Sequence, residues 1–396
     1  MTASAAVPGA SSDPEAGPVS AQPALPRLGA LLDRLVVPTA AVLVSALLFG
    51  AFVALAGADP IEVYEQMYRG AFGTWFSLQN SLQRAAPLML TGLCTALPAR
   101  LGLIVIGGEG ALYVGGVAAA AVASKLTGAG PYTVLSVMAL AAMLFGGLWI
   151  GTAGALRAKR GVNETISSLL LFYIGLGIFL YLVEGPLRDP SSLNKPSTYP
   201  VGEANMLGAL PGMDVHYGLL FGVIACLAAY VLMEHTTFGF AARVVGGNPR
   251  AAQVAGLPIT RLMLMVCTLA GAAAGLAGAV EVVAVEGSAN ASLYAGLGFA
   301  GVLVAFVARQ HALAILIVAF VMGGIEASGG VLQRRHDLPD AAVDVFKGIL
   351  FLVILASETY VARAQAAAQR WVAEHTPPET SAEPVGTVAT APRAST

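Results

Sequence analysis

Charge is the scarcest ingredient of this 396-residue chain. Only 11% of its residues are Asp, Glu, Lys or Arg, whereas 57% are hydrophobic, and the mean hydropathy is +0.75. A soluble protein of this size carries about 25% charged residues. The low charge therefore argues against a soluble globular enzyme and indicates a membrane protein. With a net charge of −2 and no basic cluster, the chain also gives no sign of binding nucleic acid.

Several chemical motifs are missing as well. The chain contains no G-x-x-x-x-G-K-[ST] phosphate loop, so any ATP hydrolysis has to come from another polypeptide. Its three cysteines and five histidines are scattered without the spacing of a metal site. No nucleophile elbow and no pair of catalytic carboxylates is recognisable. These absences argue against an enzyme and predict no metal or other cofactor in this chain.

Long apolar runs take the place of these motifs. Several contain no charged residue and are long enough to cross about 30 Å of hydrocarbon as a helix. We therefore expect an all-α membrane protein with about ten transmembrane helices. The predicted crossings are 36–57, 84–101, 103–124, 132–156, 163–184, 216–233, 259–283, 292–309, 311–332 and 341–360.

These crossings define a membrane domain, 31–361, between two tails, 1–30 and 362–396, whose composition predicts disorder. Placing both termini in the cytoplasm puts more of the 21 Lys and Arg residues on the inner side. The outer side then holds an interfacial segment, 59–83, and a loop, 185–215. We expect a multi-pass protein of the plasma (inner) membrane.

A compact polar segment, 238–261, separates two apolar runs on the predicted inner side. Asn248 is a preferred N-cap residue, and Pro249 suits the first helical position because its missing N–H costs nothing there. Gly256 is typical of a helix stop. The pattern predicts a two-turn helix from Pro249 to Ala255. A short helix kept between two spans is suited to docking a cytoplasmic partner.

Two crossings contain glycines together with carboxylates. Four glycines surround Glu109 in GLIVIGGEGA, and a second glycine-rich stretch, 281–301, carries Glu281 and Glu286. Interrupted, charge-bearing helices at corresponding places in two halves are typical of a solute pathway between inverted repeats. Close packing through small residues explains the glycines but leaves the carboxylates unexplained.

Three roles remain open for Glu109: it braces the break by accepting backbone hydrogen bonds, contacts solute, or carries a proton. Bracing is the preferred interpretation. Asn163 is expected to cap a helix, and Glu164 to complement the dipole of its first turn. Asp344 and Lys347, spaced i,i+3, are expected to pair at the outer end of the last span.

Four motifs resemble, in the same order, those of ABC importer permeases for simple sugars and nucleosides, the branched-chain amino acid and ribose-type family. They are GLIVIGGEGA, GVNETISSLLLFYI, the segment VGGNPRAAQVAGLPITR with the span after it, and GFAGVLVAFVA. The chain departs from the family pattern at Val105 and Phe172, where the family has Asn. It departs again at Ala111, where the family has Gln. A more apolar pathway, and a different solute, would follow from these changes.

The resemblance implies a fold with inverted repeats and broken helices, similar to type II importer permeases. It further implies alternating access driven by a separate ABC ATPase subunit, which binds ATP and Mg²⁺. The other implied partners are a second permease, preferably a paralogue and otherwise a copy, an external solute-binding protein or lipoprotein, and membrane lipid. The candidate pathway residues are Val105, Gly107, Gly108, Glu109, Gly110, Ala111, Phe172 and Glu281. The residues expected to couple to the ATPase are Gly247, Asn248, Pro249, Arg250, Ala251, Ala252, Ala255 and Gly256.

Two alternatives remain. The carboxylate-bearing breaks also suit an ion- or proton-coupled secondary transporter that works without an ATPase. A membrane-embedded enzyme acting on lipids ranks last, because no set of Asp, His or Ser residues converges at one membrane face.

Overall fold

A computed structural model describes residues 26–126, 128–336, 339 and 341–357. These residues form helices, with three isolated β-bridges and no sheet among them. The helices of the first half are α1 Pro26–Leu55, α2 Pro60–Phe72, α3 Trp75–Ala99, α4 Gly108–Ala123, α5 Pro131–Arg160 and α6 Glu164–Glu184. The second half contains η1 Glu203–Asn205, α7 Gly218–His235, α8 Thr237–Gly247, α9 Pro249–Val254, α10 Ile259–Val280, the π-helical η2 Glu281–Glu286, η3 Ala291–Leu293, α11 Leu297–Val307 and α12 Ala312–His336. A last helix covers residues 341–357.

The expected count of ten crossings is not confirmed. Among the described residues, five helices are long and apolar enough to span a membrane, or six if the pair Thr39–Leu55 and Pro60–Phe72, bent by 116°, counts as one. Part of the shortfall lies at the two breaks. α4 has 16 residues and α11 has 11, whereas a helix needs about 20 apolar residues to cross the hydrocarbon alone.

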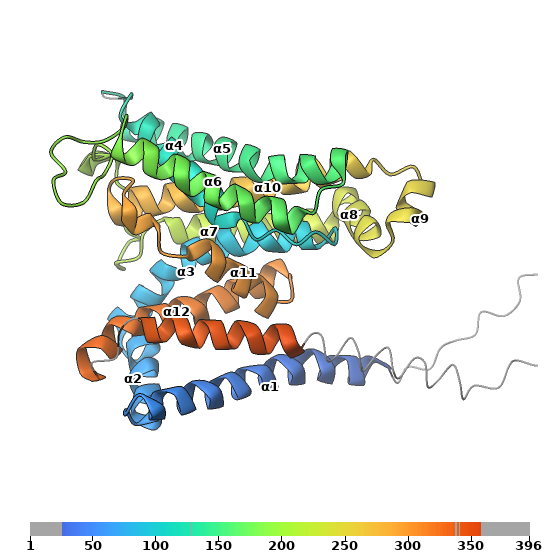
Figure 1. The fold of residues 1–396 in the computed structure, drawn as a ribbon, viewed down its shortest axis with the longest axis horizontal. Helices are drawn as coiled ribbons and strands as arrows, with labels where there is room; N and C mark the ends of the chain where they lie inside the picture. Colours follow the sequence, from blue (N-terminus) through green and yellow to red (C-terminus); the bar gives the residue numbers. More distant parts are fainter. Residues whose placement is uncertain (1–25, 127, 337–338, 340, 358–396) are drawn as a thin grey trace, which may run out of the picture.

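The helices divide into a main bundle and a smaller layer beside it. The bundle consists of α4, α5, α6, α7 and α10 (Figure 1). Along its lower side lie α3, α11 and α12, and the outermost layer contains α1 beside the helix 341–357. A separate apolar cluster joins that outermost layer to α2 and α12 through residues such as Phe49, Met67, Leu332 and Phe346.

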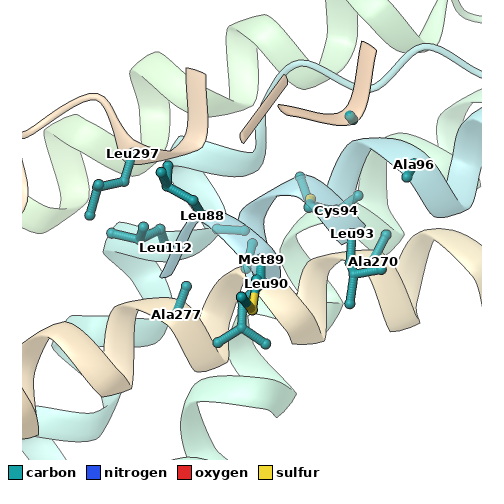
Figure 2. Close-up of a cluster of buried hydrophobic side chains, with 14 of the residues drawn as sticks. Leu88, Met89, Leu90, Leu93, Cys94, Ala96, Leu112, Ala270, Ala277 and Leu297 are labelled. Carbon is teal, nitrogen blue, oxygen red and sulfur yellow. The ribbon is translucent and has the colours of Figure 1, made fainter. Parts of the chain in front are cut away.

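Buried residues of α3 lie at the centre of the main core. Leu88, Leu90 and Leu93 of α3 are at most 2% exposed and pack with residues from α4, α10 and α11, among them Leu112 and Ala277 (Figure 2). The remaining labelled residues of this cluster are Met89, Cys94, Ala96, Ala270 and Leu297. This core fixes the two short helices, α4 and α11, against the long ones.

Small residues let α10 approach both α5 and α4 closely. A Cβ at Gly275 would clash with the carbonyl oxygen of Ala142 in α5, and one at Gly278 would clash with the carbonyl oxygen of Leu112 in α4. Helices in membranes commonly associate through such small residues, because close backbone contact gains van der Waals energy where no hydrophobic force acts. The glycines of this span therefore serve packing.

The two ends of the molecule differ. α8 and α9 lie at one end, toward which the start of α1 and the end of the helix 341–357 also point; the loop 185–217 and α2 lie toward the opposite end (Figure 1). The expected loop 185–215 is irregular apart from η1. α1 begins at Pro26, before the expected domain boundary at residue 31. The tails before residue 26 and after residue 357 lie outside the described residues.

Candidate functional site

The first predicted break is present as a non-helical segment, 103–107, between α3 and α4. The first turns of α6 hold it by three hydrogen bonds. Ile104 N donates to Glu164 Oε1 (3.4 Å), Ile106 N donates to Ser168 Oγ (3.2 Å), and Thr165 Oγ1 donates to the Ile104 carbonyl oxygen (2.9 Å). These side chains supply the partners that a helix would otherwise provide, which a buried backbone requires.

Glycine is needed where α4 begins. A Cβ at Gly107 would clash with the carbonyl oxygen of Ser168, and one at Gly110 would come within 2.8 Å of the Phe172 Cα. The glycines of the GLIVIGGEGA motif thus allow the start of α4 to press against the backbone of α6. At its N-terminus, α6 is capped as predicted, since Ile166 N donates to Asn163 Oδ1 (3.1 Å).

Glu109, in the first turn of α4, clamps the N-terminus of α11. Its side chain is 0% exposed. Oε1 accepts hydrogen bonds from Tyr113 Oη (2.7 Å) and Gly296 N (3.0 Å), and Oε2 accepts them from Gly298 N and from Phe299 N (3.3 Å). The carboxylate therefore satisfies N–H groups that the start of α11 would otherwise leave unpaired, and its charge complements the positive end of the α11 dipole. Of the three roles considered for Glu109, this geometry is that of a brace.

The second predicted break separates α10 from α11. α10 runs into the π-helical turn η2, which ends at Gly287 (φ +68°), and α11 starts after Gly296 (φ +73°). Both glycines occupy the left-handed region that other residues rarely adopt. Asn290 fixes the loop between them, because its side-chain amide donates to Glu286 Oε2 (3.0 Å) and its Oδ1 accepts from Ser292 N (2.8 Å). The Glu109 clamp thus joins the first break to the second.

A cavity of about 440 Å³ lies beside this clamp. It is bounded by Ile106 of the first break, by Gly296 and Phe299 at the start of α11, and by the helix 341–357, which contributes Lys347 and Phe351. Phe299 also stacks edge-on against Phe172 of α6, with ring centroids 5.1 Å apart.

Lys347 supplies the cationic group of this cavity. Its Nζ lies 2.9 Å from Asp344 Oδ1, the predicted i,i+3 pair, and 3.1 Å from Glu326 Oε1 on α12. The Lys347 and Glu326 side chains are only 17% and 9% exposed, whereas that of Asp344 is 73% exposed. The Glu326 contact was not predicted, because the partners lie 21 residues apart on different helices.

The predicted pathway residues gather at the clamp, but several are packed away. Val105 and Ala111 are 0% exposed and Phe172 is 5% exposed, so their side chains belong to the core. Neither Val105 nor Ala111 is among the residues that line the cavity beside α11. Gly107, Gly108 and Gly110 provide close helix contacts. Glu281 lies apart from them, in the π-helical turn at the end of α10.

The predicted docking helix is present as α9. Asn248 Oδ1 accepts from Arg250 N and Ala251 N, both at 3.1 Å, Pro249 is the first helical residue, and Gly256 takes φ +72°. Of the eight residues expected to contact a partner, only Ala252 is buried. Gly247, Asn248, Pro249, Arg250, Ala251, Ala255 and Gly256 are exposed. The sequence interpretation did not foresee α8, whose cap is Thr236 Oγ1, accepting from Gly239 N (3.2 Å).

An ionic network ties this end of the molecule to α11. Glu234 of α7 bridges Arg100, which follows α3, and Arg243 of α8, at 3.0 and 2.8 Å. Arg100 Nε also donates to the carbonyl oxygen of Gln310, three residues beyond α11 (3.3 Å). No sequence motif marks this network, which joins four separate elements.

No metal centre accompanies these features: among the described residues, no group of His, Cys, Asp and Glu is arranged to hold an ion. Residues 77–355 match the family of permease components of branched-chain amino acid transport systems. The chain is 32% identical over 334 residues to a glucose ABC transporter permease of Haloferax volcanii, covering 82% of this chain and 87% of the relative.

Two relatives from one organism are also similar. A guanosine ABC transporter permease of Bacillus subtilis is 28% identical, covering 82% of this chain and 94% of the relative. A second guanosine permease of the same species is 25% identical, covering 72% and 92%. No solved structure matches the chain significantly. The chain therefore belongs to the branched-chain amino acid transport system permease family, and it is a multi-pass membrane subunit of an ABC importer rather than an enzyme.

Proposed function

We propose that this chain forms part of the membrane pathway for a nucleoside or a simple sugar. The supporting observation is the pair of opposed breaks, joined by Glu109 and bordered by the cavity at Phe299 and Lys347. Broken helices that meet near the membrane midplane are where transporters bind solute. Ile106, Gly296 and Phe299 replace the buried Val105 and Ala111 as the residues expected to meet it.

The cavity suits a small ring-shaped solute that carries hydroxyl groups. Its volume of about 440 Å³ lies within the ~300–1,000 Å³ of small-molecule sites. Phe299 and Phe351 offer flat apolar faces, and Asp344 and Lys347 offer an acceptor and a donor. Two relatives of this chain are named as glucose and guanosine permeases, and both of these solutes combine a ring with hydroxyl groups.

A separate ATPase, which binds ATP and Mg²⁺, drives the pathway by docking on α9 and α8. The exposed surface of α9 supports this role, because Asn248 and Pro249 fix a rigid helix on a short loop between two spans. Movement of the ATPase would then bias the spans between inward-open and outward-open states.

The full assembly requires further subunits. A second permease completes the pathway, and an external binding protein delivers the solute. The two guanosine permeases of Bacillus subtilis, both similar to this chain, favour a paralogue over a copy. The finer fold, with about ten crossings, inverted repeats and both termini in the cytoplasm of the inner membrane, stays part of this proposal.

Reconstitution in liposomes tests the proposal. The chain is assembled with its ATPase, second permease and binding protein, and uptake of labelled nucleosides and sugars is followed with and without ATP. Uptake is expected only with the complete set and ATP. Deleting 249–255 should abolish ATPase association while insertion continues. Concentrative uptake by this chain alone under an ion gradient would instead establish a secondary transporter.

A further inference from the structure

An apolar groove of about 840 Å³ runs between α4, α5 and α6, on the side of α4 away from the long interface with α10. Its walls are aliphatic and aromatic side chains such as Val117, Leu148 and Ile178. Leu148 is 57% exposed and Ile178 is 38% exposed, so the groove opens to the surroundings of the protein. In a membrane-spanning bundle, these surroundings are lipid.

The groove has fixed walls. Trp149 of α5 lines it and donates its indole N–H to the carbonyl oxygen of Leu171 in α6 (3.2 Å). This bond ties the two helices that form one side. The α4 wall is held by the close packing of Gly115 against Gly275 of α10. The shape therefore persists in the absence of any occupant, as ligand sites commonly do.

One end of the groove is cationic and polar. Lys125 and Leu187 line both the groove and an adjoining pocket of about 450 Å³, to which Ser124, Tyr199 and Asn205 contribute. Lys125 takes part in none of the ion pairs formed by the described residues. The groove thus passes from a long apolar channel to a polar pocket with an ammonium group at the junction.

The dimensions fit one leaflet of a bilayer. From Val114 to Ala123, its last residue, α4 runs along the groove over about 14 Å, taking 1.5 Å per residue. Half of the hydrocarbon core measures about 15 Å. Lys125 follows the end of α4 near the loop 185–217, the end remote from α9 (Figure 1). The apolar length therefore ends where the lipid head groups begin.

We propose that this groove binds a glycerophospholipid, with an acyl chain along α4 and the phosphate against Lys125. Charge decides between this occupant and a helix of a second permease. A lipid brings an anionic phosphate to the level of the ammonium, where a charge-assisted hydrogen bond can form, and an apolar tail for the rest. A transmembrane helix would have to place a carboxylate at that level.

Retention of lipid by the purified complex tests the proposal. The intact complex is exchanged into detergent, and bound phospholipid is measured by native mass spectrometry. Wild type should retain a phospholipid that survives delipidation. Ala118→Phe, which fills the groove, should remove it, and Lys125→Met, which leaves the groove open, should lower its retention several-fold. Because the side chain of Lys125 is exposed, Lys125→Met tests the site without disturbing the fold.

Two matched variants serve as controls. Ala228→Phe adds the same bulk on an exposed part of α7, and Lys159→Met removes a charge at the opposite end of α5; both should retain lipid like wild type. Equal retention by Ala118→Phe, Lys125→Met and the controls would overturn the proposal. So would efficient cross-linking of a cysteine at residue 118 to the second permease, because the groove would then be a subunit interface.

Discussion

The two ends of α11 are held in different ways. At its N-terminus, the wholly buried Glu109 accepts hydrogen bonds from three backbone N–H groups and from Tyr113. Beyond its C-terminus, Gln310 accepts one bond from Arg100, whose partner Glu234 sits in a network with side chains 23–35% exposed. The same helix is thus held firmly beside the cavity at Phe299 and loosely at the α8–α9 end.

Water accounts for the difference. Donors that lose a partner inside the protein pay a desolvation penalty, so a buried, fully paired carboxylate is expensive to remove. Ion pairs that touch solvent are screened and contribute little. The contrast indicates a fixed contact at the Glu109 end, and at the Glu234 end contacts that are free to rearrange under the proposed docking of an ATPase on α8 and α9.

The largest expected effect comes from Glu109→Ala, which strands the N–H groups of α11. Each buried donor left without a partner costs about 1–3 kcal/mol, and the loss is seen as a lower unfolding temperature of the purified complex and loss of uptake. Tyr113→Phe, which removes one of the four bonds, should cost about 1 kcal/mol. Equal stability of Glu109→Ala and wild type would contradict the claim that Glu109 holds the N-terminus of α11 firmly.

Lys347→Met should rank next, because it leaves Glu326 without its cation on a side chain 9% exposed. A cost of about 3 kcal/mol is typical of a broken buried pair, whereas replacing both partners by apolar residues is nearly neutral. The double variant Lys347→Met/Glu326→Leu should therefore recover most of the stability measured by thermal unfolding. If it recovers stability without uptake, Lys347 has a role in transport beyond packing.

Asn248→Ala tests the docking end with a smaller expected effect. Loss of an N-cap costs about 1 kcal/mol and frays α9, so affinity for the ATPase should fall while the unfolding of the membrane core changes little. Gln253→Ala on the same helix, which is exposed and makes no cap, is the control. Equal ATPase affinity of the two variants would contradict the role of α9.

The smallest expected effect on stability belongs to Glu234→Gln. Partly exposed ion pairs are worth about 0–1 kcal/mol, and raising the salt toward 1 M should reproduce the change in wild type because the Debye length falls to about 3 Å. The coupling of ATP hydrolysis to uptake should respond more than stability does. A cost as large as that of Glu109→Ala would remove the contrast between the two ends.

Features set by adjacent residues could be predicted from the sequence. Asn248 and Gly256 bound α9, and Asn163 caps α6, because capping depends on side chains within a few positions. The glycines around Glu109 marked the first break for the same reason. The function was predicted from the four family motifs taken together in order, because any single motif is weak evidence.

Features that depend on distant contacts could not be predicted. Ser168 holds Ile106 across 62 residues, and Arg100 reaches Gln310 across 210. The count of ten crossings is not confirmed, because apolar composition does not reveal that α4 and α11 are too short to span alone. Val105 and Phe172 are predicted pathway residues from their motif positions, and the sequence does not reveal that their side chains lie in the core.

Thiol labelling of the cavity beside α11 tests the central claim most directly. The three native cysteines are buried, so a cysteine at Gly348, an exposed position that lines the cavity, reports its own reactivity with a water-soluble reagent. The account predicts a labelling rate that changes several-fold when the reconstituted complex binds a non-hydrolysable ATP analogue, and protection by transported solute. A rate unaffected by nucleotide and solute, like that of a cysteine at Ala228 on the α7 surface, would contradict it.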